Sequence, residues 1–314
     1  MSCLHLSRFF VNGLGMATNL AIGQVFCSNL ANNYAIIGFY QGAYGIGGIT
    51  APLIATSLVS RGSTWSRFYI ILLCLASLNL VFSAWAYWSY EKESSNDSET
   101  ILPFSATESP ATKKGAVSKR WHSFKTLLSN KPTLLGALFI FAYQGAEVAI
   151  SGWIISFLVQ FRHGDPSKVG FVTSGFWAGI TLGRFTLSFV AHKIGERLFV
   201  FIVTAGALIL ELLIWFVPSV VGDSVGVAFS GLLLGPVYAC GVHIFQRLIP
   251  KNMQLSSLSL IASVGSSGGA VAPFITGVLA QRVGTFVLHP ICIGLFVAMA
   301  VTWWALPKPE KRDE

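Results

Sequence analysis

GGITAPLI at residues 47–54 recurs as GGAVAPFI at residues 268–275. The two copies share the pattern GGxxAPxI, and their prolines, Pro52 and Pro273, are 221 positions apart. Each copy lies in a long apolar stretch, which follows a stretch with spaced glycines and precedes an aromatic-rich one. A repeat in such matching surroundings indicates that the chain contains two related halves, as secondary transporters do.

The composition indicates that lipid surrounds most of the protein. Of the 314 residues, 53% are hydrophobic and only 11% are charged, and the mean hydropathy is +0.65. A soluble domain usually has about 25% charged residues. The apolar residues form blocks of roughly 20, which is the length that an α-helix needs to cross the hydrocarbon core of a bilayer.

Nine such blocks predict an all-α membrane protein with nine transmembrane helices. Helices are expected because a backbone exposed to lipid must satisfy its own hydrogen bonds, and the sequence lacks the alternating segments of a transmembrane barrel. No removable signal peptide is expected. The blocks span approximately residues 13–31, 35–60, 67–90, 133–159, 169–190, 198–218, 224–246, 256–281 and 285–306.

The positions of the basic residues predict the orientation in the membrane. If the loop at 91–132 is cytoplasmic, 15 lysines and arginines fall on the cytoplasmic side and six on the other side. This asymmetry satisfies the positive-inside rule and explains the net charge of +8 without nucleic-acid binding. We therefore expect the loop and the C-terminus in the cytoplasm, an unmodified sequon at Asn96, and a location in the plasma membrane.

The repeat also predicts how the chain is divided. Three apolar blocks of the second half precede the counterpart of 13–31, but subtracting 221 from their positions gives numbers below 1. We therefore expect the first half of this sequence to contain three helices fewer than the second. We expect a partial N-terminal bundle at 1–90, a flexible linker at 91–132, a six-helix C-terminal bundle at 133–306 and a cytoplasmic tail at 307–314.

Three motifs resemble the major facilitator superfamily, and most closely its fucose-permease-like fungal branch: YQGAE at 143–147, GFWAGITLGR at 175–184 and GLLLGPVY at 231–238. The resemblance covers about residues 10–306 except the linker. It implies a secondary transporter working by alternating access, with these blocks as helices 4 to 12 of a twelve-helix fold. Bacterial sugar permeases of the branch use acidic residues in helices 1 and 4, whereas block 13–31 offers only Asn19 and Gln24 as deep polar side chains.

Glu147 is the leading candidate for a site that binds solute and proton. A charge in mid-membrane is costly, so such a residue usually faces a cavity or a partner. Tyr143 and Ser151 lie four residues before and after it, which gives a polar stripe on one helix face. The alternative is a neutral structural glutamate that is hydrogen-bonded to another helix. Glu211 has no polar stripe, and we expect it to be protonated or to reach toward the interface.

The repeated glycines and prolines are candidates for gating. Glycine lets helices approach closely, and proline bends a helix, so the repeat would let two helices rock between outward-open and inward-open states. Static packing is the alternative. The residues are Gly47, Gly48, Pro52, Gly268, Gly269 and Pro273.

Other residues have two interpretations each. Arg184, expected at the cytoplasmic end of its helix, is a candidate for a charge relay between helices or for simple anchoring. Trp177, and less strongly Trp153 and Tyr238, are candidates for stacking on a sugar ring or for a place in the interfacial aromatic belt. The five cysteines show no CxxC spacing and are expected to be structural.

These features predict a transporter of a small polar solute, with a sugar as the first candidate and a proton as the coupling ion. It would act as a monomer in the lipid bilayer. No nucleophile triad, phosphate-binding loop, dinucleotide motif or metal cluster is found, so the sequence predicts no enzyme activity, cofactor or metal. The alternatives are a non-transporting membrane protein that senses solute or binds partners, and a shortened gene model of a twelve-helix transporter.

Overall fold

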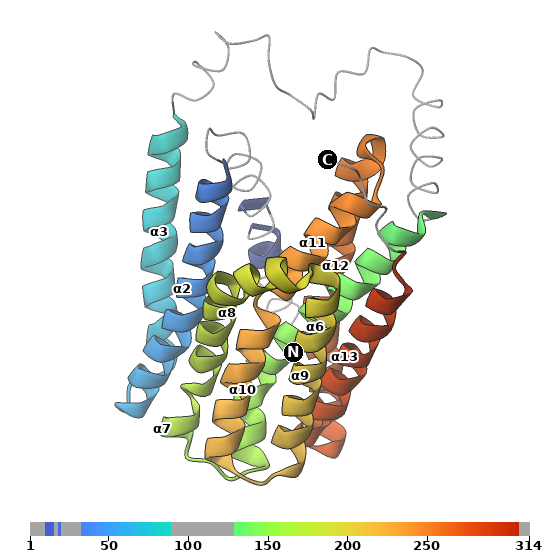
Figure 1. Cartoon of the computed structure of the whole chain (residues 1–314). Coiled ribbons are helices and arrows are strands. Elements are labelled where there is room, and N and C mark those ends of the chain that lie inside the picture. The colour runs from blue at the N-terminus through green and yellow to red at the C-terminus, as the bar shows by residue number, and fades with distance from the viewer. Residues whose placement is uncertain (1–9, 16–17, 20–32, 89–128, 308–314) are drawn as a thin grey trace.

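The computed structural model describes residues 10–15, 18–19, 33–88 and 129–307, and these are helical almost throughout, with no strand among them (Figure 1). Seven stretches of the described residues are long and apolar enough to cross a membrane. The prediction of an all-α, multi-pass integral membrane protein is confirmed. The stretches are Ala43–Ser60, Arg67–Trp85, Lys131–Gln160, Glu196–Phe216, Val220–Leu248, Ser256–Val283 and Thr285–Ala305.

Two of the predicted blocks are not among these seven stretches. The helix predicted at 169–190 forms as α8 (Val172–Ile194), and this helix contains Arg184 and Lys193. Most of the block at 13–31 lies outside the described residues.

In the N-terminal part, α2 (Asn33–Ser60) contains Pro52 and is followed by α3 (Arg67–Tyr87). The turn between them includes Gly62, whose φ of 75° lies in the left-handed region that glycine adopts without strain. α2 packs against α8, and α3 has few contacts with α2 (Figure 1). The large apolar side chains of α3 are mostly exposed, as lipid-facing side chains would be.

The C-terminal part is a bundle around one long central helix, α6. α12 and α13 pack along α6, α10 packs along α8, and α9 contacts α10 and α13 (Figure 1). The elements are α6 (Lys131–Gln160), α7 (Pro166–Val169), α8, α9 (Glu196–Phe216), α10 (Val220–Leu234), α11 (Val237–Leu248), α12 (Lys251–Val283), the 3-10 turn η1 (Thr285–Val287) and α13 (Leu288–Ala305).

The helix predicted at 224–246 is interrupted in the structure. α10 ends at Leu234 and α11 begins at Val237, because Pro236 has no amide hydrogen with which to continue the helix. Gly235 lies directly against α8, where an added Cβ atom would be 2.5 Å from the Ile180 carbonyl oxygen. The interruption therefore coincides with a close helix contact.

Glycines set how closely the bundle helices approach. Lipid is as apolar as a leucine side chain, so helices in a bilayer associate through close packing. On α8, Gly179 and Gly183 face the carbonyls of Ala228 and Leu232 on α10, and a Cβ at either glycine would collide with that backbone. α8 is thereby fixed in rotation as well as in position.

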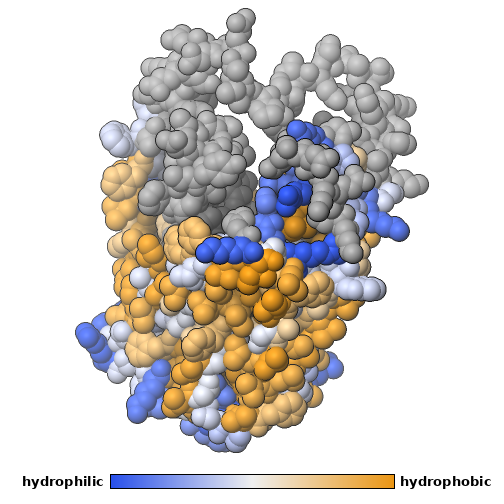
Figure 2. Space-filling view, viewed as in Figure 1, coloured by the Kyte–Doolittle hydropathy of each residue, from blue (hydrophilic) through white to orange (hydrophobic). Residues whose placement is uncertain are grey.

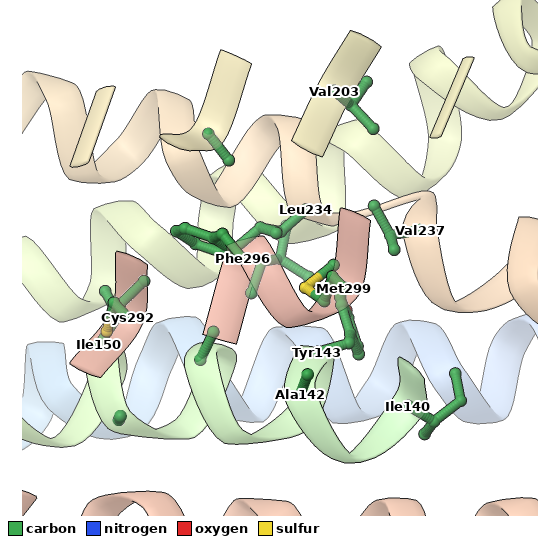
Figure 3. Close-up of a cluster of buried hydrophobic side chains, with 14 of the residues drawn as sticks. Ile140, Ala142, Tyr143, Ile150, Val203, Leu234, Val237, Cys292, Phe296 and Met299 are labelled. Carbon is green, nitrogen blue, oxygen red and sulfur yellow. The ribbon is translucent and has the colours of Figure 1, made fainter. Parts of the chain in front are cut away.

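The core is formed by aromatic and aliphatic side chains from α6 and from α8 to α13. Figure 3 shows Tyr143 on α6 among the buried side chains of Leu234, Phe296 and Met299. Figure 2 shows that hydrophobic residues cover the middle of the visible face, whereas hydrophilic residues lie along the upper border of this belt and toward its lower end. This distribution matches a lipid-facing belt with polar ends.

Candidate functional site

Glu147 on α6 faces Arg184 on α8. The Glu147 Oε1 atom is 3.9 Å from the Arg184 Nη2 atom, and the side chains are 6% and 27% exposed. The distance is that of an ion pair without a direct hydrogen bond. Away from bulk water the attraction between the two charges is stronger than at a protein surface. Each charge therefore lowers the free-energy cost of burying the other in the membrane.

Arg184 does not lie where the sequence interpretation placed it. It lies in the middle of α8, ten residues before the helix ends at Ile194, and not at the cytoplasmic helix end. The neighbouring Gly183 packs on the Leu232 carbonyl, which fixes the rotation of α8 and leaves Arg184 on the side of Glu147. The anchoring interpretation of Arg184 is therefore less suitable than a role beside Glu147.

Three tyrosines surround the ion pair. Tyr143, Tyr238 and Tyr44 come from α6, α11 and α2, and each hydroxyl is within electrostatic range of both Glu147 and Arg184. The rings of Tyr143 and Tyr238 have their centroids 6.2 Å apart. The Tyr143 ring is buried in the bundle core. Helices of both halves of the chain therefore contribute hydroxyl groups to one place.

Trp177 connects this cluster to the first copy of the repeat. Its ring meets that of Tyr44 edge to face, with centroids 5.8 Å apart. A Cβ atom at Gly48 would be 2.9 Å from Trp177 Cδ2, so α2 can lie this close to the indole only because residue 48 is glycine. Trp177 and Gly48, which were predicted for different roles, are in direct contact.

The other residues predicted for the solute site are Ser151, Asn19 and Gln24, and the structure does not show them in contact with Glu147 or Arg184. The Ser151 hydroxyl donates to the Val148 carbonyl of its own helix at 3.2 Å, and the Ser151 carbonyl accepts from the Thr173 hydroxyl at 3.2 Å. Ser151 thus links α6 to α8. Asn19 is exposed, and Gln24 lies outside the described residues.

The second copy of the repeat packs tightly on α6. A Cβ atom at Gly268 would collide with the Phe141 carbonyl, and one at Gly269 would be 3.2 Å from Val148 Cγ2. At Gly47, the counterpart of Gly268, no described atom lies within 4 Å of an added Cβ. Pro52 and Pro273 both lie inside helices, α2 and α12 respectively.

Glu211 does not reach toward the interface, which was one of its two expected states, because its side chain is buried against a partner. The His289 Nδ1 atom lies 2.8 Å from Glu211 Oε1, and the side chains are 1% and 2% exposed. His289 stands at the start of α13 and is 78 positions away in sequence. Nothing in the local pattern around Glu211 indicates this pairing.

A second buried ion pair joins Arg162 to Asp223 at 3.0 Å. Asp223 lies in the first turn of α10, where the helix dipole favours a negative charge. Arg162 also donates to the carbonyls of Ile214 and Trp215, both at 2.8 Å, near the end of α9. Arg162 therefore connects the segment after α6 to two further helices.

Among the described residues, no three His, Cys, Asp or Glu side chains are grouped so that they could hold a metal ion. Asp165 caps the short helix α7, and the Ser167 hydroxyl and backbone amide donate to its carboxylate at 2.7 and 2.9 Å. These hydrogen bonds lower the pKa of Asp165 below its usual range.

Comparisons with known proteins agree with this architecture. The family model described as Major Facilitator Superfamily matches residues 5–273. "Bypass of stop codon protein 6" of Saccharomyces cerevisiae is 26% identical over 96% of this chain and 64% of its own length. "Glucose/mannose transporter GlcP" of Bacillus subtilis is 22% identical over 93% of this chain and 68% of its own length. "Glucose/galactose transporter" of Brucella abortus is 28% identical over 51% of this chain and 39% of its own length. The chain thus spans about two thirds or less of the length of these relatives.

Proposed function

Because the chain belongs to the major facilitator superfamily, we propose that it moves a small polar solute across the plasma membrane by alternating access, with a sugar as the first candidate. Two relatives carry glucose, mannose or galactose in their names, which supports a sugar as the solute. The observation that carries the proposal is the ion pair of Glu147 and Arg184, ringed by tyrosines from three helices.

The solute would bind between α2, α6, α8 and α11. Arginine, glutamate and tyrosine side chains can together donate to and accept from the hydroxyl groups of a sugar. The Trp177 face offers an apolar surface for the C–H face of a sugar ring, which has both apolar and polar sides. Arg184 is more exposed than Glu147, so it is the charged group that a solute would meet first.

Glu147 is the proposed proton carrier. While its carboxylate is charged, it holds the Arg184 guanidinium by electrostatic attraction. A proton on Glu147 removes that attraction, and Arg184 is then released to hydrogen-bond with the solute. Loss of the proton restores the ion pair and expels the solute. The movement of the proton and that of the solute across the membrane are thereby coupled in one direction.

The two repeat-bearing helices are the proposed moving elements. α2 contacts α8 through Gly48 and Trp177, and α12 contacts α6 through Gly268 and Gly269. Each contact places a glycine of one helix directly against its neighbour, so the two helices can approach closely. Along the chain, we propose a partial N-terminal bundle at 1–90, a linker at 91–132, a C-terminal bundle at 133–306 and a tail at 307–314. The linker and the tail would be cytoplasmic, because most basic residues then lie inside.

Uptake of radiolabelled glucose, mannose and galactose into proteoliposomes tests the proposal. We expect an inward proton gradient to stimulate uptake by the unchanged protein and not by the Glu147→Gln variant, which cannot exchange a proton at that position. Asp165→Asn is the matched control, because it also removes one carboxylate but lies in a loop outside the membrane spans. Equal stimulation in the unchanged protein and Glu147→Gln would remove Glu147 from the mechanism. Sugar-dependent thermal stabilisation without any uptake would favour the solute sensor.

A further inference from the structure

Trp153 joins α6 to α12 at the proline of the second repeat. Its indole Nε1 atom donates to the Pro273 carbonyl oxygen at 3.1 Å, across 120 positions of sequence. Pro273 lies in the interior of the 33-residue helix α12. Because proline has no amide hydrogen, the Gly269 carbonyl one turn earlier loses its partner in the helix, and α12 is weakest against bending at this point.

The indole ring packs on α12 where Gly277 has no side chain. A Cβ atom at Gly277 would be 2.7 Å from Trp153 Cζ2, so a larger residue there would push the ring away. Gly277 lies one turn after Pro273, on the C-terminal side of the proline. Trp153 therefore contacts the proline carbonyl and the next turn of α12 at once.

The opposite side of α6 is fixed at nearly the same level. The Thr173 hydroxyl on α8 donates to the Ser151 carbonyl on α6 at 3.2 Å, two residues before Trp153. The segment of α6 that holds α12 is therefore itself held by α8. Before the proline, α12 contacts α6 through Gly268 at Phe141, a backbone contact that lets one helix slide on the other.

The first repeat has a close contact at the equivalent turn. Thr56 lies four residues after Pro52, as Gly277 lies four residues after Pro273. A Cβ atom at Gly170, just before α8, would be 2.5 Å from Thr56 Cγ2. In both copies, the turn that follows the proline is held against the C-terminal bundle through a glycine.

We propose that Trp153 is a latch that fixes the part of α12 after Pro273 to α6, so that bending of α12 moves residues 251–272 alone. This inference rests on the alternating access proposed above and adds a positioning residue to it. Trp153 does not touch the solute site; it sets which part of α12 moves.

Hydrogen exchange in the purified protein tests the latch directly. In Trp153→Phe we expect the backbone amides of residues 274–283 to exchange about fivefold faster, as the loss of one hydrogen bond implies. Trp303→Phe is the matched control, because the Trp303 indole also donates to a backbone carbonyl, that of Arg197, at 2.9 Å. It should leave these amides unchanged. No acceleration in Trp153→Phe, or an equal one in both variants, would overturn the latch.

A second variant separates the latch from general loosening. Gly277→Ala should displace the indole and accelerate the same amides about fivefold. In the Trp153→Phe background, where no indole remains to be displaced, the alanine should add nothing. Additive effects of the two changes would contradict the proposed contact.

Sugar uptake then tests the link to transport. We expect Trp153→Phe to change the maximal uptake rate by at least about threefold and the KM by less than about twofold, because the latch acts on helix movement and not on solute contacts. An unchanged maximal rate would reduce Trp153 to a packing residue. If the unchanged protein shows no uptake, the transport proposal fails, whereas the exchange measurement still decides whether the latch exists.

Discussion

Replacing His289 with leucine should destabilise the folded protein by about 3 kcal/mol, because it leaves the buried Glu211 carboxyl group without its partner. The Glu211 carboxylate would lose its contact at 2.8 Å and stay in a site where both side chains are at most 2% exposed. The Phe157 ring lies edge-on to His289 at 4.3 Å and the Trp215 ring stacks near it at 6.3 Å, so two aromatic rings lie beside the imidazole.

Replacing both partners should cost less than replacing His289 alone. The double variant Glu211→Leu and His289→Leu leaves no buried charge and fills the space with apolar atoms, and such exchanges are often neutral or stabilising. The bundle itself supplies a matched control. His243 and Glu196 form the same kind of pair at 2.6 Å, but the side chains are 46% and 8% exposed, so water can replace His243 and His243→Leu should cost less than His289→Leu.

Equilibrium unfolding in mixed detergent micelles at pH 7 measures these free energies. We expect His289→Leu to be the least stable of the three variants, and both the double variant and His243→Leu to be closer to the unchanged protein. If the double variant is as unstable as His289→Leu, burial of an unpaired charge is not the cause. If His289→Leu and His243→Leu have equal effects, burial does not set the strength of the pair.

Three further predictions concern other contacts. Arg162→Gln leaves the Asp223 carboxylate without its cation and should lower the unfolding free energy by about 3 kcal/mol, measured in the same micelles; an effect below 1 kcal/mol would contradict the role of the pair. Gly268→Ala should cost about 1–3 kcal/mol by forcing α12 away from α6, whereas Gly294→Ala, which has no described atom within 4 Å of the new Cβ, should be neutral in the same assay. The folded-state pKa of Asp165 is depressed, so the stability it contributes should be complete above the unfolded value of about 3.9 and be lost as the pH falls through the folded value; carboxyl-carbon NMR titration should show this lowered pKa, which Ser167→Ala should raise.

The sequence predicts the helices well because the thickness of a bilayer limits the length of each apolar block. It predicts the interruption at Pro236 poorly, since the hydropathy stays high across residues 224–246 and only the missing amide hydrogen breaks the helix. The multi-pass architecture follows from composition and periodicity. The packing of α8 on α10 does not follow from composition and periodicity, because it depends on glycine contacts between segments that are distant in sequence.

In the candidate site too, the sequence predicts features within one helix but not contacts between helices. The polar stripe of Tyr143 and Glu147 is visible in a single helix. The partnership of Glu147 with Arg184 requires the rotation of α8, and that rotation is set by where Gly183 meets α10. Hydropathy alone suggests a cytoplasmic helix end for an arginine near the edge of an apolar block. The sequence therefore does not predict that Arg184 lies in the middle of α8.

The geometry of the buried charge pairs distinguishes the proposed solute site from structural contacts. The pair of Glu211 with His289 and the pair of Arg162 with Asp223 are short, at 2.8 and 3.0 Å, and no side chain in them is more than 9% exposed. Such pairs are closed to solute, and each side chain in them is held by its partner in the pair. Glu147 and Arg184 are 3.9 Å apart, and Arg184 is 27% exposed. A longer pair with one accessible partner loses less when it separates, so it is the pair that can exchange its internal partner for a solute hydroxyl and a proton.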